Sequence, residues 1–143
     1  MIAIIFLILI FPGISFAEDN WEEYASTSYG ISYYNCEQIF YSSDYVLRAW
    51  AKTKLNEKGK EKVTSLNPDM KHADYLLRLS EIDCNKRKSR SLAIVGYSSK
   101  NEPLTDAKSA IGNWENIVPE SDTYLLSKIV CDKFGREVCK KPK

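Results

Sequence analysis

The chain has little of what most enzymes require. It contains one histidine and six glycines, and it lacks a phosphate-binding loop, a dinucleotide fingerprint, a Gly-x-Ser-x-Gly elbow and a His-Glu-x-x-His pair. The single His72 lies in a charged segment, where a solvated loop position is expected. Glu81 and Asp83 would share one strand face, but surface carboxylates are common, and Asp83 is expected to bond to backbone beside Cys84. The sequence therefore predicts a protein that is not an enzyme and needs no cofactor.

An excess of charge of one sign is also absent. The formal net charge is +1 at pH 7. Nonspecific binding to nucleic acid requires an excess of Lys and Arg, because those side chains displace the counterions of the phosphates. The sequence thus predicts no nucleic-acid partner. Since aromatic residues make up 12% of the chain and glycine is scarce, we expect a folded protein and not a disordered tail.

Long apolar runs are missing except at the start of the chain. Met1–Phe11 is entirely apolar, Pro12 breaks any helix, and the small residues Ser15 and Ala17 follow. This order is typical of a secretory signal peptide, even though no Lys or Arg precedes the run. We expect cleavage between Ala17 and Glu18.

The rival interpretation of the apolar run is a retained membrane anchor. The run is too short for that, because spanning a bilayer takes about 20 apolar residues. No cysteine lies near the cleavage point to carry a lipid anchor. We therefore predict a signal peptide at 1–17 and one exported domain at 18–143, with no transmembrane segment after cleavage.

Closely spaced cysteines are also lacking. Zinc ligands usually come in pairs separated by two to four residues, whereas Cys131 and Cys139 have seven between them. Together with Cys36 and Cys84 they make an even number, which in an exported chain predicts disulfide bonds. All three pairings remain open from spacing alone. A Cys131–Cys139 bond would be local, and a Cys84–Cys131 bond would tie a strand to the C-terminal helix.

What the mature chain does contain is strand character. Residues 45–55 alternate, with Trp50 and Lys52 on one face and Ala49 and Ala51 on the other, as in a strand with one solvated face. Other aromatic, β-branched or alternating segments predict further strands, at 21–24, 30–34, 37–41, 73–84 and 91–97. We expect a turn or bulge at 35–36, a hairpin around 85–88, and a loop at 56–72, with or without a short helical turn.

The last third of the chain has helical spacing. Residues 119–122, Pro-Glu-Ser-Asp, are a helix-start cluster. Leu125, Leu126, Ile129 and Val130 then recur at the spacing of one helix face, and a glycine at position 135 can end the helix. Because a single sheet must cover its apolar face, the prediction is an α+β fold. It consists of one antiparallel sheet of five or six strands with a C-terminal helix packed on one face.

Several short motifs resemble one known family. They are Trp50 in its alternating strand, Glu-Ile-Asp-Cys at 81–84, Trp-Glu-Asn-Ile-Val-Pro-Glu-Ser at 114–121, and Val-Cys at 130–131. In this order and spacing the chain resembles the surface-adhesin protein E family over nearly all of 18–143. The resemblance implies an antiparallel sheet whose C-terminal helix is tethered by a Cys84–Cys131 disulfide, and it pairs Cys36 with Cys139.

The resemblance also implies a location and a class of function. The family includes a lipid-anchored bacterial surface protein that binds host matrix proteins and haem and can dimerise. We therefore expect export to the bacterial periplasm, the cell surface or the medium, contact with a protein or other envelope partner, and a capacity to form homodimers. This chain departs from that member because it lacks a lipidation cysteine.

Two groups of side chains are candidates for the partner-binding site. The first is the basic hairpin turn with Lys86, Arg87, Lys88 and Arg90, which would contact an acidic protein, a glycan or a lipid headgroup. The second is a set of tyrosines, because tyrosine is enriched at interfaces, and it comprises Tyr33 and Tyr34 together with Tyr29 and Tyr41. The alternatives are a solvated turn that protects a strand end and half-buried sheet positions.

The hypothesis is therefore an exported, non-enzymatic binding module. One alternative is a small exported enzyme, or an enzyme inhibitor with an exposed loop at 98–113. The other is an accessory structural subunit of the envelope that dimerises through a sheet edge.

Overall fold

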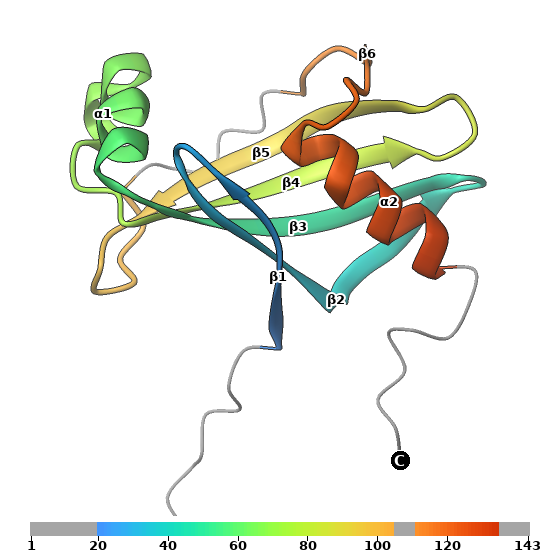
Figure 1. Cartoon of the computed structure of the whole chain (residues 1–143), viewed down its shortest axis with the longest axis horizontal. Helices are drawn as coiled ribbons and strands as arrows, with labels where there is room; N and C mark the ends of the chain where they lie inside the picture. The colour runs from blue at the N-terminus through green and yellow to red at the C-terminus, as the bar shows by residue number, and fades with distance from the viewer. Residues whose placement is uncertain (1–19, 105–110, 135–143) are drawn as a thin grey trace, which may run out of the picture.

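The computed structural model describes residues 20–104 and 111–134. In this part of the chain six strands form one antiparallel sheet in which each strand lies beside the next in sequence (Figure 1). The strands are β1 (Trp21–Thr27), β2 (Gly30–Ser43), β3 (Val46–Leu55), β4 (Tyr75–Asp83), β5 (Lys88–Tyr97) and β6 (Glu115–Asn116). The predicted α+β fold with a single antiparallel sheet is confirmed. The predicted signal peptide lies outside the described residues.

Three helical segments complete the fold. They are α1 (Glu57–Leu66), the short 3-10 helix η1 (Pro68–Met70) and α2 (Asp122–Phe134). The predicted C-terminal helix is α2, and it begins directly after the Pro-Glu-Ser cluster. The position-135 glycine proposed as its end lies outside the described residues.

The prediction of a loop at 56–72 is wrong. Asn56 caps α1, because its side chain accepts a hydrogen bond from the backbone N–H of Gly59 at 2.9 Å. Gly59 is a close-approach position and not a helix breaker, since an added Cβ would lie 2.1 Å from the carbonyl oxygen of Tyr29. Pro68 likewise occupies the first turn of η1, where proline is tolerated. The glycine that indicated a loop is explained by its close packing against Tyr29, and the proline by its place in the first turn of η1.

The two strands predicted at 30–34 and 37–41 are one continuous strand, β2, with a bulge. Tyr34 pairs with Ala51 of β3, and the next pair is Ile39 with Ala49. The residues from 35 to 38 therefore stand opposite Trp50 alone. This irregularity bends β2 sharply, as bulges do, and it leaves the backbone at Trp50 without a direct partner on β2.

The hydrophobic core lies on one face of the sheet, beneath α2. Ala49 and Ile82 from the sheet and Leu126 and Val130 from the helix are all fully buried. The small Ala49 allows close approach of the helix, whose apolar stripe fills the space above β1, β2 and β3. The helix contributes the apolar cover that the sheet lacks.

The other two helical segments contact this same face. Leu55 and Gly96 are in phase with the core positions of their strands. A Cβ added at Gly59 in α1 would lie 3.2 Å from Cδ2 of Leu55, and one added at Gly96 would lie 3.4 Å from the Met70 side chain of η1. All helices of the described residues thus approach one face of the sheet. The opposite face, called the open face below, carries none of them.

A disulfide bond links the sheet to α2. Cys84, which directly follows β4, is bonded to Cys131 of the helix, with 5.7 Å between the Cα atoms. This pairing, implied by the family resemblance, is confirmed. Cys139 lies outside the described residues, so its pairing with Cys36 stays a prediction.

Candidate functional site

The open face carries large half-exposed side chains in place of the expected polar ones. Strand pairing puts the following side chains on it: Tyr33 of β2, Arg48, Trp50 and Lys52 of β3, Tyr75, Leu77, Leu79 and Glu81 of β4, and Arg90 and Tyr97 of β5. Apart from Glu81, all of them are half-buried, and none is covered by a described helix. An uncovered sheet face of this composition is typical of a recognition surface.

A groove crosses the open face where β2 bulges away from β3. Its volume is about 290 Å³. The aromatic and apolar lining comes from Trp21, Trp50, Tyr75 and Leu77, and the polar lining from Asn35, Gln38 and Lys52. We call it the tryptophan groove. It exists because the bulge removes the β2 side chain that would otherwise stand beside Trp50.

One wall of the tryptophan groove is a stack of aromatic rings with a cation on top. The rings of Tyr75 and Tyr97 are parallel within 4° and their centroids lie 5.0 Å apart. Nζ of Lys52 lies 4.5 Å from the centroid of the Tyr75 ring, which is cation–π geometry. The Tyr75 hydroxyl donates to Oδ1 of Asn101 at 3.1 Å. The wall is therefore fixed in position and carries one positive charge.

A buried carboxylate, Glu81, lies further along the open face. Only 2% of its side chain is exposed. Nε of Arg48 lies 2.9 Å from one carboxylate oxygen, and Arg90 donates to the other through two nitrogens at 2.7 Å. Ser42 donates a further hydrogen bond at 3.1 Å. The arrangement compensates the buried charge, as such groups require.

These contacts decide the charge state of Glu81. Burial by itself raises the pKa of the carboxyl group. The hydrogen bonds from Arg48, Arg90 and Ser42 outweigh that effect and hold the pKa below its usual 4.5. Glu81 is therefore ionised at neutral pH and is not available as a proton donor.

Because the pKa of Glu81 is lower in the folded chain than in the unfolded chain, Glu81 stabilises the fold fully above pH 4.5. That contribution is lost as the pH falls through the folded-state pKa. We expect the free energy of unfolding, measured by urea titration at successive pH values from 4.5 downward, to decline more steeply in the wild type than in Glu81→Gln. Equal slopes for the two proteins would contradict this assignment.

The guanidinium group of Arg90 is engaged by other residues of the protein, so Arg90 does not belong to an exposed basic turn. Besides its bonds to Glu81, its guanidinium lies 4.7 Å from the centroid of the Trp114 ring, which is 36% exposed. Trp114 immediately precedes β6, which pairs with the first residues of β5. Arg90 thereby fastens this segment to the sheet, a structural role that was not predicted from the sequence.

The rest of the basic turn is where the sequence predicted it. Lys86 and Arg87 are exposed and Lys88 is half-buried at the start of β5. Oδ1 of Asp83 accepts hydrogen bonds from the backbone N–H groups of Asn85 and Lys86 at 3.0 and 2.8 Å, so the predicted role of Asp83 is confirmed. The turn is six residues along β4 from Leu77, or roughly 20 Å, so it is separate from the tryptophan groove.

The tyrosine candidates do not form one surface. Tyr34 is only 2% exposed, packs edge-on against Tyr24, and donates to Oε2 of Glu22 at 2.7 Å. It faces the core and presents no ring to a partner. Tyr33, in contrast, lies on the open face, while Tyr29 and Tyr41 are exposed elsewhere.

His72 is exposed in the turn between η1 and β4, as expected for a solvated histidine. Among residues 20–104 and 111–134, no three His, Cys, Asp or Glu side chains are grouped so that they could hold a metal ion. The loop proposed for an inhibitor, 98–113, falls partly outside the described residues.

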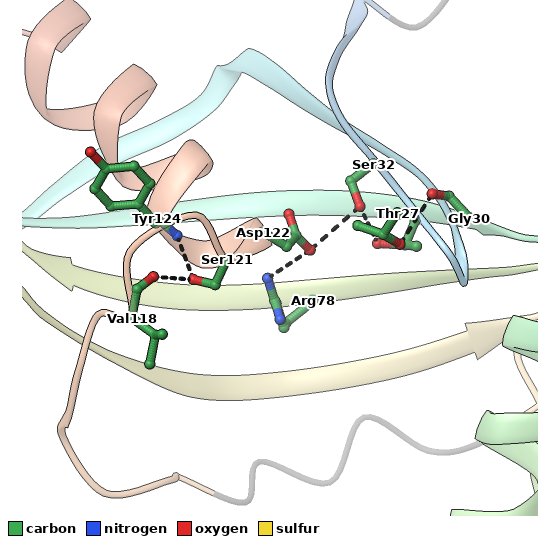
Figure 2. A network of polar contacts seen from close by, with 9 residues as sticks. Thr27, Gly30, Ser32, Arg78, Val118, Ser121, Asp122 and Tyr124 are labelled. Atoms are coloured by element: carbon green, nitrogen blue, oxygen red, sulfur yellow. Dashed lines mark hydrogen bonds and ion pairs between the residues drawn. The ribbon is translucent and has the colours of Figure 1, made fainter.

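A polar network on the helix-covered face of the sheet holds the start of α2 (Figure 2). Oγ of Ser121 accepts from the backbone N–H of Tyr124 at 3.1 Å and donates to the carbonyl of Val118 at 2.7 Å. A carboxylate oxygen of Asp122 lies 3.6 Å from a guanidinium nitrogen of Arg78 and accepts from Ser32 at 3.4 Å. Because this network lies between helix and sheet, its role is to position α2.

The tryptophan groove was not predicted from the sequence. Trp50 was placed on the solvated face and contributed to the family resemblance, but no binding role was predicted for Trp50, Asn35 or Gln38. One signal was available, since a tryptophan that alternates with lysines on a solvated strand face is unusual. No sequence pattern could place Trp21 in this groove, because its proximity to Trp50 depends on the bend of β2.

Comparison with known proteins identifies the family. The family model described as "Surface-adhesin protein E" matches residues 21–132. The chain belongs to the surface-adhesin protein E family. This match includes the open face, the disulfide and nearly all of α2, and it confirms the family resemblance seen in the sequence.

Solved structures of protein E from Haemophilus influenzae are similar to this chain. Crystal form II has a TM-score of 0.60 at 12% identity, and the match covers 83% of this chain and 92% of that one. A structure of protein E from the non-typeable organism has a TM-score of 0.57 at 11% identity, covering 85% and 81%. At such identities the likeness shows the fold alone. No match was found among curated protein sequences.

The family is one of adhesin-like surface proteins. Of the helices described, none combines the length and the apolar character that crossing a bilayer demands.

Proposed function

We propose that the mature chain is an exported, non-enzymatic binding module that contacts a macromolecular partner at the bacterial cell surface through its open face. The observation that carries this proposal is the uncovered aromatic surface around Trp50 and Tyr75. A two-layer domain normally buries its apolar sheet faces. A sheet face that keeps large rings half-exposed supports a role in recognition.

The charged groups of the open face support binding over catalysis. Glu81 is held ionised by Arg48 and Arg90, so it serves poorly as a general acid. Lys52 is held over the Tyr75 ring, where its ammonium group can contact a ligand. His72 lies on a turn away from these groups.

Export is supported by two independent features. The Cys84–Cys131 bond is of the kind that persists in oxidising compartments such as the periplasm. Residues 1–17 have the order of a signal peptide, with an apolar run followed by a helix breaker and small residues. Digestion by protease added to intact cells tests which side of the outer membrane the chain faces. The mass in solution tests whether the chain dimerises.

The test has two parts. Full-length tagged protein expressed in bacteria is first tested for cleavage after Ala17 and for digestion by protease added to intact cells. Purified mature protein is then titrated onto surfaces coated with host matrix proteins, and its mass is measured in solution. We expect an exported, surface-accessible chain that binds saturably.

Charge reversal on each face of the sheet supplies the matched comparison. Lys52→Glu on the open face should weaken binding about tenfold, which corresponds to one lost polar contact. Lys58→Glu, on α1 at the other face, should leave binding unchanged. A chain that stays in the cytoplasm, or equal effects of the two variants, would overturn the proposal.

A further inference from the structure

We propose that the tryptophan groove binds a saccharide, with one sugar ring seated against Trp50 and the rest of the glycan extending over the open face. The inference rests on the proposed binding role of the open face and names the ligand class of that site. Four features carry it: the size of the groove, its aromatic lining, an amide donor that bonds to no described residue, and its low charge.

Size comes first. The groove volume of about 290 Å³ is at the lower end of the range for small-molecule sites, roughly 300–1,000 Å³. This suits one ring of a larger molecule better than a whole cofactor. The groove is set in the face of the sheet and open to solvent, so the neighbouring units of a chain can continue outward.

The aromatic lining matches the apolar face of a sugar ring. Trp21 and Trp50 are both half-buried and line the same groove, and Tyr75 adds a third ring. The face of an aromatic ring carries partial negative charge, so it attracts the slightly positive C–H groups that a pyranose presents on one side. Because Trp50 has no directly paired residue on β2, a ring can approach it from that side.

Asn35 supplies a preorganised polar contact. The residue is only 7% exposed, and its Oδ1 is occupied by the backbone N–H of Glu37 at 2.9 Å. Its Nδ2 donates to no described residue. That nitrogen lines the groove and is therefore available to donate to an acceptor on a ligand. The bulge therefore holds a donor ready at the edge of the groove, where Asn35 is part of the lining.

The remaining polar lining is also suited to hydroxyl groups. Gln38 is exposed and brings both amide donors and an acceptor, and Lys52 brings donors from the other wall. Sugar hydroxyls donate and accept, so they can satisfy a mixed set of this kind. The combination of stacking faces and amides is the complement of a saccharide.

Other ligand classes fit less well. Lys52 is the one cation among the residues that line the groove, which is too little charge for nucleic acid or a polyphosphate. A peptide that extends a sheet needs a free edge, whereas Trp50 and Leu77 lie on the inner strands β3 and β4. A purely apolar ligand would leave Nδ2 of Asn35 unsatisfied.

The test uses purified mature protein on an array of defined neutral and acidic oligosaccharides, followed by calorimetry with the oligosaccharide that gives the strongest signal. Asn35→Asp is the sharpest variant, because it keeps the oxygen that accepts from the backbone N–H of Glu37 and replaces the amide donor with a charged oxygen that can only accept. We expect the dissociation constant to rise about tenfold in Asn35→Asp and further in Trp50→Ala. Trp114→Ala, at the β5–β6 side of the sheet, is the matched control and should bind like the wild type.

Two results would overturn the inference. One is the absence of binding to any oligosaccharide on the array by folded wild-type protein. The other is saccharide binding that Asn35→Asp leaves unchanged while its thermal unfolding is also unchanged.

A deglycosylation experiment distinguishes a failure of the saccharide inference from a failure of the proposed function. Matrix-protein coats are compared before and after enzymatic removal of their glycans. If binding persists after deglycosylation and is still weakened by Lys52→Glu, the open face binds protein and the saccharide inference fails alone. If binding disappears with the glycans, the saccharide inference is supported.

Discussion

Replacing Cys84 and Cys131 together with serine will lower the free energy of unfolding by about 4 kcal/mol. The bond closes a loop with a sequence separation of 47 residues, and constraining an unfolded chain over that length is worth this amount in the loop-entropy model. Urea titration of the wild type and the double variant measures the difference directly. No other substitution considered for this chain has a larger expected effect.

The same titration tests the mechanism. If the bond acts on the unfolded chain, its removal lets that chain expand and expose more surface, so the dependence of unfolding free energy on urea should steepen. Ser127→Ala, a buried position on the same helix, controls for the effect of substitution in α2. A loss below about 1 kcal/mol in the double variant would show that packing of α2 alone holds the helix.

The second large effect is expected from Glu81→Ala. This substitution leaves the guanidinium groups of Arg48 and Arg90 facing one another without the carboxylate between them. Breaking a buried ion pair from one side typically costs 3–5 kcal/mol. Because Arg48 is 40% exposed and Arg90 29% exposed, water relieves part of the repulsion, and we expect about 3 kcal/mol.

Two controls make the Glu81→Ala result specific. Glu57→Ala removes an exposed ion pair to Lys60 and should change stability by no more than about 0.5 kcal/mol. The double variant Glu81→Ala/Arg90→Ala should lose less than the sum of the single losses, since it removes one of the unpaired charges. Strict additivity would mean that the two side chains are energetically independent.

The Glu81 cluster and the tryptophan groove divide the open face into two regions. Around Glu81 every charged group has a partner, so this region stabilises the sheet where no helix covers it. Around Trp50 the side chains are large and half-exposed. A surface that combines a rigid region of paired charges with an open aromatic groove is suited to binding, because little has to be reordered when a ligand arrives.

The sequence alone determined the class of fold. Alternation in residues 45–55 and helical spacing from 122 to 130 are local patterns, and local patterns report which side of an element faces the core. They predicted a single antiparallel sheet with a C-terminal helix. The family motifs added the Cys84–Cys131 bond, which spacing had left open.

Local patterns failed where long-range contacts outweighed propensity. Gly59 and Pro68 indicated a loop, but a backbone approach to Tyr29 explains the glycine and the first turn of η1 explains the proline. Tyr34 was predicted at a binding surface, yet its position just before the bulge turns its ring into the core.

The candidate binding site was decided by tertiary structure. Trp21 and Trp50 are far apart in the sequence, and they line one groove because β2 bulges between residues 34 and 39. Arg90 was predicted in an exposed basic turn, but it is occupied by Glu81, its pairing partner on β4, and by Trp114. A strand pattern states which face a side chain lies on. What else lies on that face depends on how the strands pair and bend, and that information is carried by contacts between distant parts of the chain.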